Sequence, residues 1–107
     1  ETLDRLYKNK KIDLIRMDVE GYEFNILKGA TELIKNNPGM GIFFEFHAQF
    51  FNTKKREEFI RFLRENRLRI KYLFRGDEKN PQPYTRTYKD MRNALYTTYY
   101  LYLEAVK

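Results

Sequence analysis

The chain has 107 residues, about one small domain, with 42% hydrophobic residues and a net charge of +6 from 21 Lys and Arg against 15 Asp and Glu. This composition predicts a packed core and excludes a disordered tail. Cys is absent, which excludes disulfides, thiolate metal sites and a cysteine nucleophile. No apolar run approaches the roughly 20 residues of a membrane span, and no signal-peptide pattern opens the sequence, so we expect a soluble cytoplasmic protein.

The first half of the sequence predicts a strand, a helical stretch and a second strand. Residues 12–19 are mostly apolar, which is typical of a strand buried on both faces. Thr2 is a candidate cap for a short helix that ends at about Tyr7. Helical spacing over residues 22–35 places Glu23 and Lys28 on a polar side, and Gly29 predicts a break into two short helices. Met40–Phe46 is the second apolar strand.

The second half predicts one helix and two further strands. A helix runs from about Thr53 to about Asn66, with Asn52 or Thr53 as its cap. Residues 68–74 alternate as a strand with one polar face, and the apolar positions are Leu68, Ile70 and Tyr72. Residues 76–93 are a long polar loop, and residues 95–106 have strong strand propensity.

This order of elements predicts an α/β fold. Strands that alternate with helices indicate right-handed crossovers and a mostly parallel sheet. The last two strands are separated by no evident helix, so we expect the final strand to be antiparallel.

Polar residues close both of the first two predicted strands. Asp18 and Glu20 lie at the carboxyl end of the first predicted strand, and Glu45 and His47 lie at that of the second. Ligands bind beyond the carboxyl ends of parallel strands, so we expect one cluster of three carboxylates and an imidazole there. Such a cluster is suited to abstracting a proton from a hydroxyl or to holding a hard cation. Alternatively, Glu20 and Glu45 are helix caps or surface charges, and His47 is a hydrogen-bonded structural histidine.

The sequence resembles one known family in its first half. Thr2-Leu3-Asp4, the nearly continuous run from Asp13 to Ala30 with its Asp18-Val19-Glu20-Gly21 turn, and then Glu45 and His47 are similar to the carboxyl-terminal half of FkbM-type methyltransferases. Beyond Phe51 only the order of elements is similar.

The resemblance implies a class I, Rossmann-like methyltransferase sheet that uses S-adenosylmethionine. Its reaction is methyl transfer, usually to an oxygen of a sugar, polyketide or similar small acceptor. By position, Asp18 and Glu20 would bind the methionine end of the cofactor, and Glu45 and His47 would face the acceptor. His47 or Asp18 would be the general base, and we assign no metal ligand.

One departure from the family pattern concerns the cofactor. The five glycines form no G-x-G-x-x-G pattern, and the family's other main cofactor-binding elements are absent. We therefore expect residues 1–107 to be one partial domain, the carboxyl-terminal half, which binds the cofactor poorly alone. Its exposed sheet edge would be covered by the missing amino-terminal half, by a second copy in a homodimer, or by another partner.

A different class of function is suggested by the local charge of residues 53–75. This segment holds nine basic and three acidic residues, interleaved with aromatics such as Phe59 and Tyr72. Such a surface can bind nucleic acid or an anionic membrane. The alternative is a solvated amphipathic helix whose aromatic residues belong to the core. A third class is a self-associating half-domain without catalysis.

Overall fold

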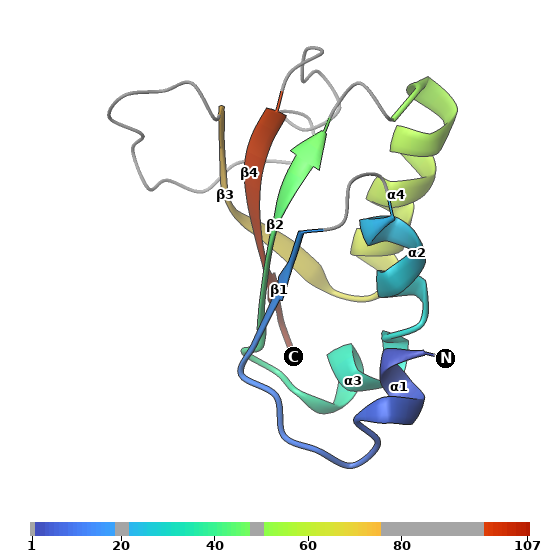
Figure 1. Ribbon diagram of the computed structural model, residues 1–107, viewed down its shortest axis with the longest axis vertical. Coiled ribbons are helices and arrows are strands. Elements are labelled where there is room, and N and C mark those ends of the chain that lie inside the picture. Colours follow the sequence, from blue (N-terminus) through green and yellow to red (C-terminus); the bar gives the residue numbers. More distant parts are fainter. Residues whose placement is uncertain (1, 19–21, 48–50, 76–97) are drawn as a thin grey trace.

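The computed structural model describes residues 2–18, 22–47, 51–75 and 98–107 (Figure 1). Four strands form one sheet in the order β1-β2-β4-β3. Their bounds are Leu14–Met17 (β1), Gly41–His47 (β2), Leu68–Arg75 (β3) and Thr98–Ala105 (β4). The predicted loop over residues 76–93 and the predicted start of the last strand, residues 95–97, lie outside the described residues.

The sheet is mixed. β1 and β2 are parallel, with Leu14 opposite Gly41 and Met17 opposite Phe44. β4 lies between β2 and β3 and is antiparallel to both, which confirms the expected antiparallel last strand. The expectation of a mostly parallel sheet holds for one neighbouring pair only, because β4 separates β3 from the other strands that share its direction.

Four helices lie together on one side of the sheet (Figure 1). The predicted break at Gly29 is confirmed, because one helix ends before it and the next begins at Thr31. The Asn52 side chain accepts the Lys55 N–H at 2.8 Å and caps the longest helix, as predicted. None of the described helices is long and apolar enough to cross a bilayer. The helices are Leu3–Leu6 (α1), Glu23–Lys28 (α2), Thr31–Asn36 (α3) and Thr53–Glu65 (α4).

The two faces of the sheet differ in their surroundings. Alternate residues of each strand pack beneath the helices, and we call this the covered face; Phe44, Leu101 and Ile70 on it are almost completely buried. The other set of residues forms the open face, and these side chains are half-buried or exposed, apart from His47 at the end of β2, which is buried. The open face consists of Leu14, Arg16, Phe43, Glu45, Tyr72, Tyr100, Tyr102 and Glu104, together with the flanking Arg69 and Lys71.

Two sequence predictions about strand burial are wrong. β1 is not buried on both faces: it is an edge strand, and Leu14 is 56% exposed. In β3 the core position is Leu73 rather than Tyr72, because the pairing with β4 shifts between Ile70 and Tyr72. An irregularity of this kind moves every later side chain to the opposite face.

Candidate functional site

The candidate site begins at the carboxyl ends of the two parallel strands. Met17 is opposite Phe44 in the register, so Asp18 and Glu45 each come one residue after this pair. Neighbouring strands lie roughly 5 Å apart, which brings these two positions close together. The parallel pairing therefore places two carboxylates of distant sequence at the same end of the sheet.

Glu45 and His47 form a direct pair on β2. Their side chains lie on the same side of the strand because they are two residues apart. His47 Nε2 is 3.4 Å from Glu45 Oε2, and the imidazole is buried while the carboxylate is partly accessible. A carboxylate in this position can orient the imidazole and stabilise the imidazolium that forms when the ring accepts a proton.

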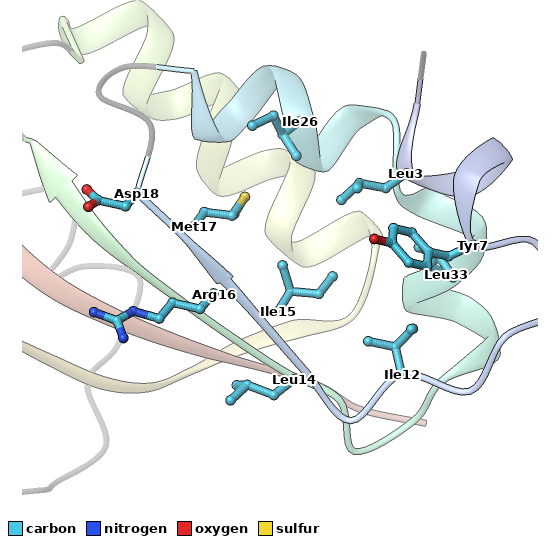
Figure 2. Close-up of a pocket in the computed structure, with 10 residues that line it drawn as sticks. All are labelled: Leu3, Tyr7, Ile12, Leu14, Ile15, Arg16, Met17, Asp18, Ile26 and Leu33. Atoms are coloured by element: carbon cyan, nitrogen blue, oxygen red, sulfur yellow. The ribbon is translucent and has the colours of Figure 1, made fainter.

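Asp18 borders a groove that runs along the outer side of β1 (Figure 2). The groove has a volume of about 480 Å³ and its lining is mostly apolar. Glu45 and His47 are not among its lining residues. The structure thus brings Glu45 and His47 together and puts Asp18 at the end of the neighbouring strand, whereas Glu20 lies outside the described residues. A single pocket shared by all four stays a prediction.

Two charged residues near this end of the sheet are buried, which was not predicted from the sequence. Glu23, expected on the polar side of its helix, is only 2% exposed in the first turn of α2. Arg56 is 9% exposed in α4, where its Nη2 donates to the Phe51 carbonyl at 3.2 Å. Its guanidinium also lies 5.8 Å from the centre of the Phe46 ring. Arg56 could have been found from spacing, since it precedes the buried Phe59 by three residues and Leu63 by seven.

The Thr2-Leu3-Asp4 and Gly29-Ala30 segments, which also carry the family resemblance, have a structural role. The Asp4 carboxylate accepts the backbone N–H groups of Glu32 and Leu33 at 3.1 and 2.9 Å, and so caps α3. The Asp4 N–H donates to the Gly29 carbonyl at 2.9 Å. A Cβ on Gly29 would lie 3.1 Å from Thr2, so a small residue is favoured there. The Thr2-Leu3-Asp4 segment and the Gly29-Ala30 segment therefore hold each other in place.

The basic segment of residues 53–75 and a metal site, the other candidates, add little to the site. Phe59 is fully buried, so this aromatic residue of the basic segment belongs to the core. Lys54, Arg61 and Arg64 of α4 are exposed. Within the described ranges, no three His, Asp or Glu side chains lie together as a metal site.

A sheet whose parallel strands end in carboxylates and an imidazole is the arrangement of an α/β ligand-binding or enzyme domain. The family model of the methyltransferase FkbM domain matches residues 1–75, which is more than half of the chain. The chain therefore belongs to the FkbM methyltransferase domain family. No curated protein and no solved structure matches it.

Proposed function

We propose that this chain is part of an S-adenosylmethionine-dependent methyltransferase and forms the carboxyl-terminal half of a class I, Rossmann-like domain. Its acceptor would be a hydroxyl of a sugar or a similar small molecule. The family supports methyl transfer. The observation that carries the proposal is the polar group at one end of the parallel pair, with Asp18 after β1 and the Glu45–His47 pair at the end of β2.

The residues at this end of the sheet fit a cationic cofactor. S-adenosylmethionine supplies an electrophilic methyl group on a sulfonium and carries an ammonium at its methionine end. The exposed Asp18 carboxylate would bind the ammonium, and Glu20 would assist from the same turn. The groove beside Asp18 has a mostly apolar lining that would contact the uncharged parts of the cofactor.

The Glu45–His47 pair would handle the proton of the acceptor. His47 would accept the hydroxyl proton while Glu45 holds the ring and balances the charge that develops. Asp18 is the alternative base. General-base catalysis contributes about 10²–10⁴-fold, and the remaining acceleration must come from alignment of the acceptor oxygen with the methyl group.

Calorimetric binding of S-adenosylhomocysteine tests the cofactor proposal. We expect weak or undetectable binding to this chain alone, and binding to the chain extended upstream on its gene. In the extended form, Asp18→Asn should weaken binding at least about tenfold, because a charged hydrogen-bond partner of the ammonium is lost. Asp13→Asn is the matched control, since Asp13 is an exposed aspartate before β1. Equal affinities of both variants, or no binding in either form, would contradict the proposal.

The base assignment is tested separately by His47→Gln. We expect a loss of about 10²–10⁴-fold in kcat with cofactor affinity unchanged. If activity is retained in His47→Gln and lost in Asp18→Asn at saturating cofactor, Asp18 is the base.

A further inference from the structure

The end of the molecule that lies opposite the candidate site carries a run of basic residues. Residues 5–11 begin in α1, lead toward β1 and lie at the lower end of the molecule in Figure 1. We call this segment the basic tip. Asp18 and the Glu45–His47 pair lie at the other end of the parallel strands. The basic tip contains no acidic residue and four basic ones, all exposed: Arg5, Lys8, Lys10 and Lys11.

The neighbours of the basic tip do not neutralise its charge. Among the described residues that line the two hollows flanking the tip, the acidic ones are Asp4, Asp13 and Glu32. The Asp4 carboxylate already accepts two backbone N–H groups of α3. Lys35, three residues after Glu32 in α3, is a further exposed basic residue. The tip and its surroundings therefore keep an excess of positive charge, which attracts anionic surfaces.

The backbone of the basic tip is held in place by hydrogen bonds. α1 lies beyond the edge strand β1, where it packs against α3. The Lys10 N–H donates to the Tyr7 carbonyl at 3.0 Å. The buried Asn37 side chain fixes the following turn, because its Oδ1 accepts the Ile12 N–H at 2.8 Å and its Nδ2 donates to the Leu33 carbonyl at 2.9 Å. A segment that is ordered in advance loses less conformational entropy when it binds a partner.

Two large apolar side chains are exposed within the same tip. Leu6 is 56% exposed, and Tyr7 is 45% exposed although its ring also borders the groove beside β1 (Figure 2). Leucine and tyrosine exposed next to lysine and arginine are typical of surfaces that bind at the interface of a bilayer. The basic side chains attract lipid phosphates, while the apolar ones enter the boundary between headgroups and acyl chains.

We propose that the basic tip docks this protein on an anionic phospholipid bilayer. A nucleic acid shares the attraction to lysine and arginine, but its phosphates offer no contact for the aliphatic side chain of Leu6. Because the tip and the candidate site lie at opposite ends of β1, docking would leave the site directed away from the bilayer. The inference goes beyond the proposed function and does not depend on it.

Co-sedimentation with lipid vesicles tests the proposal. The probe vesicles are phosphatidylcholine with about 30% phosphatidylserine, and vesicles of phosphatidylcholine alone are their control. We expect binding to the anionic vesicles to be at least about tenfold tighter. Most of this difference should disappear when the ionic strength rises from about 0.1 M to about 1 M, because salt screens exposed charges. The chain extended upstream on its gene should give the same result.

Two double variants that remove the same charge locate the contact. Lys10→Gln/Lys11→Gln should weaken binding about 25-fold, which is about fivefold for each basic residue removed. Lys54→Gln/Arg61→Gln changes exposed positions of α4 and should alter binding by less than about threefold. Leu6→Gln leaves the charge unchanged and should weaken binding at least about fivefold. Urea unfolding checks that each variant is folded.

The remaining outcomes overturn the inference. Equal binding to neutral and anionic vesicles, or binding to neither, excludes an anionic bilayer. Equal losses in the two double variants show that the overall charge attracts the vesicles rather than the tip. Unchanged vesicle binding by Leu6→Gln contradicts insertion of the tip. Binding that disappears in the extended chain shows that upstream residues cover the tip.

A nucleic acid as the partner gives a different result. The chain would then bind a single-stranded oligonucleotide and no vesicles. Lys10→Gln/Lys11→Gln would weaken that binding, whereas Leu6→Gln would leave it unchanged. This pattern overturns docking on a bilayer and assigns the basic tip to a nucleic acid.

Discussion

The covered and open faces of the sheet are built from the same strands but differ in the burial and packing of their side chains. Phe44 and Phe43 are neighbours on β2, yet Phe44 is 1% exposed beneath α4 while Phe43 is only half-buried among tyrosines. The covered face holds the continuous core. The open face holds ring contacts, a few ion pairs and the Glu45–His47 pair. The packed core thus lies on the covered face.

Substituting the two phenylalanines tests this comparison with the largest expected effect. Phe44→Ala should lower the free energy of unfolding by about 3–5 kcal/mol, because it leaves a cavity against Phe59. Phe43→Ala is the matched control and should cost about 1 kcal/mol, since its ring contacts with Tyr100 and Tyr102 are partly solvated. Urea unfolding followed by circular dichroism measures both. Equal losses in the free energy of unfolding would show that Phe43 is covered as fully as Phe44 in the isolated chain.

Gly41 tests how closely the open face is packed at one point. A Cβ on Gly41 would overlap the ring of Tyr102, with its Cζ at 2.7 Å, because this ring leans across the strand. Gly41→Ala should therefore cost about 1–3 kcal/mol. In a Tyr102→Ala background the same substitution should cost nothing or stabilise the strand slightly. Additive effects in this double-mutant cycle would contradict the contact.

Asp4 tests the attachment of the helix that lies beyond the sheet. Asp4→Ala removes both acceptors of the α3 N–H groups and should cost about 1–2 kcal/mol in urea unfolding. Asp4→Asn keeps one acceptor oxygen and should cost less. Full stability of Asp4→Ala would mean that packing on α3 and the backbone hydrogen bond to the Gly29 carbonyl are enough to hold α1 in place.

The elements of this fold could be predicted from sequence wherever the signal is local. Asn52 and Thr2 accept hydrogen bonds as the caps of their helices, and Gly29 separates two helices, because caps and breaks depend on neighbours in the chain. The position of β1 could not be predicted in this way. Its apolar residues suit a strand covered on both sides, and only the sheet order shows it to be an edge.

The candidate site could be predicted in part for similar reasons. Residues two apart on a strand share a face, so the contact of Glu45 with His47 follows from spacing. The burial of Glu23 could not be predicted from the hydrophobic pattern, which treats a charged residue as surface, whereas Arg56 shares the helical spacing of the buried Phe59 and Leu63. Their burial depends on how α2 and α4 pack above the sheet.

Substitution of Glu104 should have the smallest effect on stability, and this effect should depend on pH. On the open face its Oε1 accepts a hydrogen bond from Arg69 Nε at 2.8 Å, and Lys71 Nζ lies 3.5 Å from Oε2. The hydrogen bond from Arg69, reinforced by both positive charges, lowers the pKa of Glu104 below its ordinary value of 4.5. A carboxylate with a lowered pKa in the folded state stabilises the protein above its unfolded pKa, and this contribution is lost as the pH falls through the folded pKa.

Glu104→Gln should therefore reduce stability by at most about 1 kcal/mol at pH 7, because the pair is partly exposed, and the difference from the original protein should shrink below pH 4.5. Arg69→Gln is the partner variant, and the double variant should cost less than the sum of the two single variants. Thermal unfolding between pH 3 and pH 7 measures the effect. A pH-independent difference would mean that the charge of Glu104 does not stabilise the open face.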